Sequence, residues 1–372
     1  QKAPGSYDFR VYSSLVKKEK NIWDILSNYG KKVFVFNAPN VLRAYKINGY
    51  MVAGWLCTSE EKLTYPKSLR EEIYNLNYER DIWAIEKILI DDREFSRRQM
   101  EITEKHYNIL LHFLKRDWDF GFVVFTELDR VSHRFSWDTK NSLLRHYQNM
   151  DRKLKQLLDK LDSENNETTI MIVSDHGFGP NKRIFLINEW LKKKGFLEVE
   201  RMPAIKLANS LMLILRRPNI LKILRLLAKF LPLIPLYQSV YPRTGRLPIL
   251  WDKTKAFAYS TWGAIYINLS DREPQGIVKE EEYEKLRGEI IEGLREISIK
   301  AYRREELYHG EYLELAPDII VQRDDNVNSI DAKIGYGKEF LEGMGGSHRI
   351  NGTFIAWGPN IKENNEINAK IY

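Results

Sequence analysis

The sequence of 372 residues contains a single cysteine, Cys57, so no disulfide bond can form within the chain. It contains no uninterrupted apolar run near the roughly 20 residues that a bilayer-spanning helix needs. It also lacks low-complexity tracts and internal repeats. These absences exclude a disulfide-stabilised domain, a transmembrane helix and a repeat array, and the lone thiol fits a reducing compartment. We therefore expect a globular, cytoplasmic protein.

The chain also lacks an initiator methionine, and its first residues, QKAPGSYDFR, contain no apolar core of a signal peptide. This beginning is typical of a sequence that starts partway through a longer protein. We expect a further segment upstream of Gln1.

Acidic residues are missing from one segment of the chain. Residues 201–250 contain nine Lys or Arg and no Asp or Glu, whereas the other 322 residues contain 49 basic and 51 acidic side chains. The net charge of +7 therefore belongs to this segment. Because a nucleic-acid-binding protein needs a basic patch on the body of its fold, we expect no nucleic-acid partner.

Helical and strand-like patterns alternate along the first 200 residues. Residues 21–30 form a helix pattern with Asn21 as its N-cap and Gly30 as its stop, and the apolar, β-branched run VFVF follows. Residues 94–115 predict a second helix, the run 122–125 a second strand, and residues 143–161 an amphipathic helix. The stretch TTIMIVSDHG then predicts another buried strand. This order predicts right-handed crossovers and a parallel sheet.

The pattern changes after residue 200. Residues 201–250 are basic, apolar and interrupted by prolines, which indicates an inserted helical element. Strand-like runs return in KAFAYS and AIYINL, followed by a helix over 280–297 and the strands of PDIIVQ and TFIAWG. The sequence therefore predicts one catalytic α/β domain, 1–200 with 251–372, and a basic helical cap at 201–250.

Carboxylates and imidazoles follow three of the predicted strands. Asp129 and His133 come just after one strand, where a loop is expected, Asp175 and His176 come directly after another, and His348 lies in a glycine-rich loop before a third. Ligands of open α/β sheets gather at the carboxyl ends of the strands. Zn²⁺ and Mn²⁺ bind carboxylate oxygens and imidazole nitrogens, so these five residues predict a metal site.

Each motif alone has a simpler interpretation. An isolated Asp-x-x-x-His is more often a capping Asp with a surface His, and Asp-His-Gly also makes an ordinary turn. The position of three histidines at strand ends, rather than any one motif, favours the metal site. The remaining histidines fall on helix patterns or in an acidic loop and are interpreted as structural: His106, His112, His146 and His309.

The stretches LDRVSH, VSDHGFG and GSHRINGTFIAWGP, in this order, resemble the metal-ligand motifs of the alkaline phosphatase superfamily. The branch that they resemble is type I phosphodiesterase/nucleotide pyrophosphatase, in particular its prokaryotic, largely uncharacterised members. Other stretches resemble the same branch: YDFR, IWDIL, NGYMVAGW, FLINEWLKKKGFL, YINLSDREPQGIV and APDIIV. The resemblance covers nearly the whole chain except 201–250.

The resemblance implies an α/β/α sandwich with a central, mostly parallel sheet and a helical insertion. It also implies two divalent ions, commonly Zn²⁺, with Mn²⁺ as the alternative. Asp129, His133 and His348 would bind one ion, and Asp175 and His176 would help to bind the second. The implied activity is metal-dependent hydrolysis of phosphodiester or pyrophosphate bonds in a small phosphorylated substrate, such as a nucleotide.

The chain departs from the family pattern at its beginning. Family members have a further Asp ligand and a Thr or Ser nucleophile before the segment that resembles PGSYDFR, so we expect both upstream of Gln1, and no catalytic residue is assigned within the chain. Ser6 falls downstream of the expected position. Phosphomonoesterase, phosphotransferase or sulfatase activity and a catalytically silent scaffold are the alternatives, although Cys57, in WLCTSEE, lacks the sulfatase pattern C-x-P-x-R.

The basic segment 201–250 allows two interpretations. Its apolar residues between 219 and 231 follow helical spacing, and Lys222, Arg225 and Lys229 form a basic stripe beside them. One interpretation is a cap helix on the catalytic domain, and the other is an interfacial helix on an anionic membrane. We favour the cap, because solvated basic helix faces are common.

Overall fold

The computed structural model describes residues 2–3, 5–9, 19–82, 87, 90–135, 140–164, 167–201, 209, 249–259, 261, 263–324, 327–359 and 361–362. The chain divides into two compact units. Unit 1 comprises Gln1–Arg10 with Thr169–Tyr372, and unit 2 comprises Val11–Thr168. The predicted cap lies outside the described residues over 202–208 and 210–248, so the cap and the membrane alternative stay predictions.

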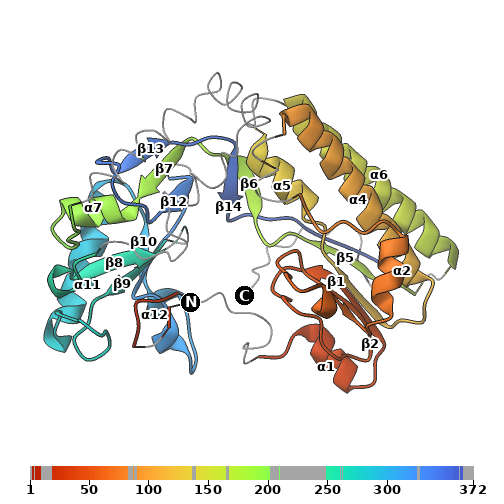
Figure 1. The fold of residues 1–372 in the computed structure, drawn as a ribbon, viewed down its shortest axis with the longest axis horizontal. Coiled ribbons are helices and arrows are strands. Elements are labelled where there is room, and N and C mark those ends of the chain that lie inside the picture. Colours follow the sequence, from red (N-terminus) through yellow and green to blue (C-terminus); the bar gives the residue numbers. More distant parts are fainter. Residues whose placement is uncertain are drawn as a thin grey trace. The chain divides into compact units, whose positions relative to one another are not determined.

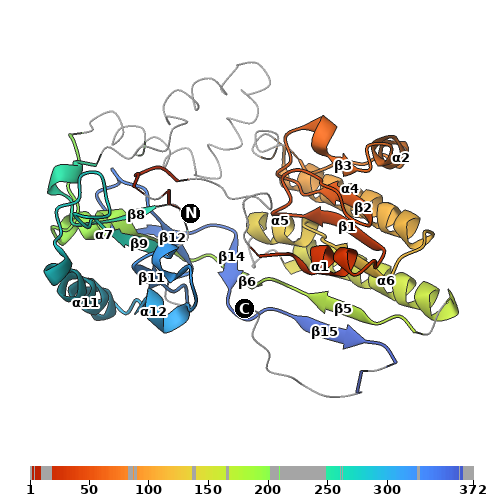
Figure 2. The same cartoon turned by 90° about the horizontal axis from the view of Figure 1, so that it is seen from below.

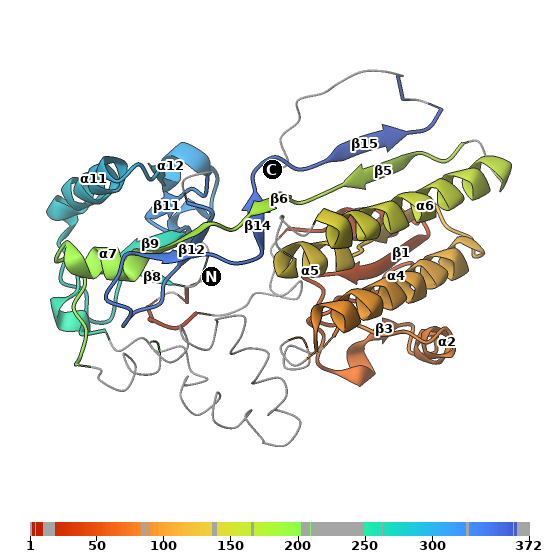
Figure 3. The ribbon, with the colours of Figure 1, turned by 90° about the horizontal axis from the view of Figure 1, so that it is seen from above.

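Unit 2 is built on a four-stranded sheet with helices packed on it (Figures 1 and 3). Its elements are α1 (Ile22–Asn28), β1 (Val33–Ala38), β2 (Gly49–Ala53), a 3₁₀ turn (Glu60–Lys62), β3 (Thr64–Tyr65), α2 (Leu69–Asn75), α4 (Asp92–Leu114), β4 (Phe120–Val123), α5 (Glu127–Arg134) and α6 (Lys140–Glu164). The strand order is β3-β2-β1-β4, and β1 pairs in parallel with both β2 and β4. The predicted α/β class with a mostly parallel sheet is confirmed for this unit.

Strand β1 is the centre of the unit 2 core. All six of its residues are buried, because strands flank it on both edges and side chains cover both faces. Helix α4 presents buried residues at helical spacing, among them Ile102, Ile109 and Phe113, and the ring of Phe113 stacks on that of Phe34 at 5.3 Å. Helix α4 begins after Asp91, whose carboxylate accepts a hydrogen bond from the backbone N–H of Glu94 at 2.8 Å.

Unit 1 contains several small sheets rather than one large one (Figures 1 and 2). Its elements are β5 (Ile170–Val173), β6 (Gly177–Pro180), β7 (Arg183–Leu186), α7 (Ile187–Lys193), a 3₁₀ turn (Trp251–Lys253), β8 (Ala256–Tyr259), β9 (Ala264–Ile267), α11 (Glu280–Glu296), β10 (Ala301–Arg303), α12 (Arg304–Leu307), a 3₁₀ turn (Leu313–Leu315), β11 (Ile319–Val321), β12 (Ser329–Asp331), β13 (Phe340–Glu342), β14 (Gly346–Arg349) and β15 (Phe354–Trp357).

The largest sheet of unit 1 is antiparallel, in the order β10-β11-β9-β8. The smaller sheets are β12-β7-β13, β14-β6 and β15-β5. Helix α11 contributes its apolar face to the same core as the largest sheet, with Leu286, Ile290 and Leu294 buried at steps of four. The core of unit 1 therefore lies between α11, α7 and this antiparallel sheet.

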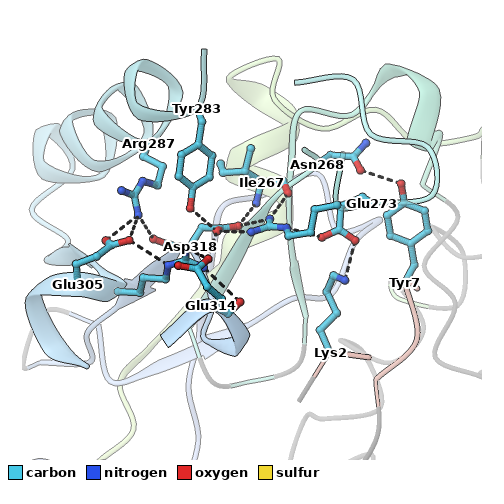
Figure 4. A network of polar contacts seen from close by, with 12 residues as sticks. Lys2, Tyr7, Ile267, Asn268, Glu273, Tyr283, Arg287, Glu305, Glu314 and Asp318 are labelled. Atoms are coloured by element: carbon cyan, nitrogen blue, oxygen red, sulfur yellow. Dashed lines mark hydrogen bonds and ion pairs between the residues drawn. The ribbon is translucent and has the colours of Figure 1, made fainter. Parts of the chain in front are cut away.

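A buried carboxylate, Asp318, links α11 to the antiparallel sheet (Figure 4). It accepts hydrogen bonds from the guanidinium of Arg272 at 2.7 and 2.6 Å, from the hydroxyl of Tyr283 at 2.6 Å and from the backbone N–H of Ile267 at 2.6 Å. Burial and the nearby charge of Asp318 raise the pKa of Tyr283, so its hydroxyl stays a donor. Because every contact of Asp318 is charge-assisted or buried, the network is interpreted as structural.

Strand β5 differs from its prediction as a buried strand. It is a strand, but it pairs antiparallel with β15 within unit 1, and the two form an extended ribbon (Figure 2). Met171 is 62% exposed and Val173 is 52% exposed. A two-stranded ribbon has no second layer of its own, so its apolar side chains stay accessible. No helix of the described residues is long and apolar enough to cross a membrane, whereas the cytoplasmic location stays a prediction.

Candidate metal centre

In unit 2, Asp129 and His133 lie on a helix rather than in the predicted loop. The chain leaves β4 at Val123 and enters α5 at Glu127. Residues four apart lie one above the other on a helix, and here the Asp129 Oδ1 and His133 Nε2 atoms are 3.4 Å apart. Glu127 and Val131 are buried on the opposite side of α5. The buried side fixes the helix and leaves the carboxylate and the imidazole on its more exposed side.

Arg130 is a partner of Asp129 that the sequence did not reveal. Its Nη1 donates to Asp129 Oδ2 at 2.8 Å and its Nε donates to Asp81 Oδ2 at 2.9 Å. The guanidinium carbon lies 4.2 Å from the ring centroid of Trp55. This arrangement orients the Asp129 carboxylate and partly neutralises it. An arginine beside an aspartate is common in sequences, so no sequence signal distinguished this one.

In unit 1, His176 and His348 stack on each other. Strand β14 pairs antiparallel with β6, and His348 lies opposite Phe178. His176 precedes Phe178 by two residues, so it lies next to His348 on the same face of the pair. The two imidazole rings are 3.6 Å apart between centroids, with 14° between their planes. The structure thus places His348 in a strand, not in the glycine-rich loop that the sequence predicted.

The hydrogen bond of His176 defines which of its nitrogens can bind a metal. Its Nδ1 lies 3.0 Å from the carbonyl oxygen of Gly177, which can only accept, so Nδ1 carries the proton in the neutral ring. The Nε2 lone pair is then the one suited to a metal, as in many metal-binding histidines. Asp175 Oδ1 lies 3.6 Å from this Nε2, and the Asp175 side chain is 89% exposed.

Glycine is required beside these histidines. A Cβ on Gly177 would lie 1.9 Å from the carbonyl oxygen of Asn351, and a Cβ on Gly179 would lie 2.7 Å from the guanidinium of Arg349. Arg349 donates from Nη2 to the carbonyl of Pro180 at 2.6 Å. The close packing explains why SDHGFG alternates histidine and phenylalanine with glycine.

The structure therefore groups the five predicted ligands as two clusters, one in each unit. Asp129 with His133 forms the helix cluster, and Asp175, His176 and His348 form the ribbon cluster. Both combine carboxylate oxygen and imidazole nitrogen, which are the donors that Zn²⁺ and Mn²⁺ accept. The donor chemistry fits a divalent ion. Convergence of all five residues in one centre involves both units and stays a prediction.

His106, which the sequence analysis interprets as structural, lies on α4 and is fully buried. Its Nδ1 lies 2.6 Å from Oε1 of Glu127, the first residue of α5. Burial alone would lower the pKa of His106, but the charge and hydrogen bond of Glu127 and the Glu79 carbonyl raise it above its ordinary value. The sequence pattern could not identify this pair, because its members are 21 residues apart on two helices.

Comparison with known proteins identifies the family. No curated protein and no solved structure matches the chain. The family model described as type I phosphodiesterase / nucleotide pyrophosphatase matches residues 4–348. That match includes both clusters of candidate ligands and nearly the whole chain. The chain therefore belongs to the type I phosphodiesterase/nucleotide pyrophosphatase family, within the alkaline phosphatase superfamily.

Proposed function

We propose that the protein hydrolyses phosphodiester or pyrophosphate bonds of a small phosphorylated substrate, using two divalent ions at the helix and ribbon clusters. The observation that carries the proposal is the pairing of carboxylate and imidazole in both clusters of a chain that belongs to a phosphodiesterase family. In this proposal Asp129, His133 and His348 hold one ion, and Asp175 and His176 help to hold the other. Zn²⁺ suits this donor set best, and Mn²⁺ is the alternative.

Bound ions would supply Lewis-acid stabilisation of the negative charge that develops during displacement at phosphorus. The chain's own residues orient the ligands for this purpose. Arg130 holds one oxygen of Asp129, which leaves the other directed toward His133. The Gly177 carbonyl keeps the His176 proton on Nδ1, so its Nε2 is the nitrogen available for binding.

The test uses the intact protein, freed of metal with a chelator and reloaded with Zn²⁺ or Mn²⁺. We expect two ions per chain by elemental analysis, and hydrolysis of bis-p-nitrophenyl phosphate that depends on their return. His309→Ala is a matched control, because His309 belongs to neither cluster. A protein that hydrolyses the diester equally well in chelator, or that binds no divalent ion, would rule out the proposal.

Substrate comparison separates the other activities of the superfamily. Bis-p-nitrophenyl phosphate, p-nitrophenyl phosphate and p-nitrophenyl sulfate report diesterase, monoesterase and sulfatase activity respectively. We expect the highest kcat/KM with the diester. Binding of two ions with no turnover of any ester would favour the catalytically silent scaffold.

A further inference from the structure

Two buried ionisable side chains lie on the inner side of α5 and on the neighbouring helix α4. His106 on α4 is 0% exposed and Glu127 on α5 is 2% exposed. Their Nδ1 and Oε1 atoms are 2.6 Å apart. Burying a carboxylate and an imidazole is unfavourable unless they satisfy each other. A pair of this kind in the core calls for an explanation beyond packing.

The contacts of His106 define the proton arrangement of the pair. Its Nε2 lies 2.7 Å from the carbonyl oxygen of Glu79, which can only accept, so Nε2 carries a proton. Its Nδ1 faces Oε1 of Glu127 at 2.6 Å, which is an ion-pair distance. His106 is further fixed by ring contacts with Phe36 at 5.0 Å and Tyr78 at 5.8 Å. It therefore offers Glu127 one rigid partner.

Glu127 is placed where it can control the metal-binding face of α5. Residues two apart on a helix project about 200° apart, so Glu127 and Asp129 lie on opposite sides. Glu127 shares the buried side with Val131, whereas His133 shares the more exposed side with Asp129. The position and rotation of this eight-residue helix therefore determine where both ligands lie.

The beginning of α5 is held by apolar packing as well as by Glu127, because Leu128 packs against a cluster that includes Phe95 and Ile102 of α4. Its N-cap residue, Thr126, makes no side-chain cap hydrogen bond. The connection before it is fixed to the sheet, because Asn37 Nδ2 donates to the Val124 carbonyl at 3.1 Å. The far end is fixed through Arg134, which donates to the Ile90 carbonyl at 2.7 Å. Glu127 thus adds a polar contact with α4 to the apolar packing of the first turn.

We propose that Glu127 and His106 are positioning residues, which hold α5 so that Asp129 and His133 can bind the same divalent ion. The inference rests on the proposed function, because it assumes that these two residues are ligands. It assigns a role to a buried pair whose atoms lie outside the metal-binding face. The pair acts through the helix and does not touch the substrate.

The experiment measures Zn²⁺ and Mn²⁺ affinity of the intact protein by titration calorimetry, with circular dichroism at the same temperature to show that each variant is folded. We expect Glu127→Ala to weaken binding at one of the two sites about 10- to 100-fold, the range found when a supporting partner of a metal ligand is removed. Glu127→Gln should keep most of the wild-type affinity, because its amide N–H can donate to Nδ1 of His106.

A second carboxylate–imidazole pair, also formed by a histidine of α4, provides the control. His112, also on α4, contacts Glu72 of α2 at 3.0 Å, and both side chains are partly exposed. Glu72→Ala removes this contact and that of Glu72 with Arg116 without touching α5, so we expect wild-type metal affinity. If Glu127→Ala does not fold, Glu127→Asp provides the test of the positioning role. Its side chain keeps the carboxylate but is one methylene shorter, so it should weaken metal binding at the same site.

The outcomes separate this inference from the proposed function. A wild-type protein that binds no divalent ion contradicts the proposed function itself. A wild-type protein that binds two ions, with folded Glu127→Ala or Glu127→Asp that bind them equally well, contradicts only the positioning role. Equal losses in Glu127→Ala, Glu127→Gln and Glu72→Ala would show a general effect on stability and would also overturn it.

Discussion

The two clusters of candidate ligands stand on different supports. In unit 2, Asp129 and His133 lie on a helix whose inner side is buried against α4 and fixed by the His106–Glu127 pair. In unit 1, His348 lies on β14 and His176 directly precedes its partner strand β6, and backbone pairing and glycines bring the two histidines together. A helix cluster depends on packing behind it, whereas a ribbon cluster depends on strand register and close backbone approach.

The difference implies different sensitivities to mutation. The helix cluster should respond to changes in buried side chains that never touch a ligand. The ribbon cluster should respond to any atom added between its strands. The predictions that follow test this contrast.

Removing one ligand from either cluster should have the largest effect. Asp129→Ala and His348→Ala each remove a metal contact that would contribute several kcal/mol to transition-state stabilisation. At about 1.4 kcal/mol per factor of ten, we expect kcat/KM for the diester to fall about a thousandfold in each variant. Steady-state kinetics of the intact protein is the measurement. A loss in only one of the two variants would show that Asp129 and His348 do not hold the same catalytic ion.

Acid should destabilise unit 2 through His146, which lies in its buried interior. Burial lowers the pKa of His146 to about 4, from an ordinary value of 6.5, and its Nε2 lies 2.9 Å from the Ser96 hydroxyl. The unfolded chain then binds a proton that the folded chain does not, so stability is fully present above pH 6.5 and is lost as the pH falls toward 4. The shift corresponds to about 3 kcal/mol.

The measurement is the free energy of unfolding in urea at pH 7 and pH 4, for wild type and His146→Gln. The glutamine does not titrate, and it can still bond to Ser96. The difference between the two proteins should change by about 3 kcal/mol over this interval. A difference that is constant with pH would mean that His146 titrates normally in the folded protein.

Gly177→Ala should disturb the ribbon cluster alone. Its Cβ would lie 1.9 Å from the Asn351 carbonyl oxygen, so the strand must move. We expect a loss of about 2 kcal/mol of stability, typical of overpacking, and a weaker metal site that includes His176. Calorimetric metal titration and urea unfolding measure both effects. Unchanged metal affinity in the folded variant would show that the strand register does not control the ribbon cluster.

Gly288→Ala should have the smallest effect on the free energy of unfolding, and it should raise this free energy rather than lower it. Gly288 lies in α11 of the same unit, and a Cβ there would meet only the Arg303 guanidinium, at an ordinary 3.7 Å. Alanine in a helix interior is favoured over glycine by about 0.5–1 kcal/mol, so the variant should be slightly more stable. Its metal affinity should equal that of wild type, which makes it the control for Gly177→Ala.

The sequence by itself determined most local elements and the identity of the candidate ligands. The helices α1, α4, α6 and α11 begin and end within a few residues of their predictions, because capping residues and apolar spacing are local signals. The three ligand motifs were recognised for the same reason, since each occupies a few consecutive residues. Their local conformation was less predictable: Asp129 and His133 lie on a helix and His348 lies in a strand.

Only the tertiary structure decided which side chains support those ligands. Arg130 contacts Asp81 across 49 residues, and His106 contacts Glu127 across 21 residues on another helix. It also decided that β5 pairs with β15, which lies far along the chain, and that His176 stacks on His348. Such contacts are formed when hydrophobic burial brings distant segments together, and local sequence patterns do not record which segments will meet.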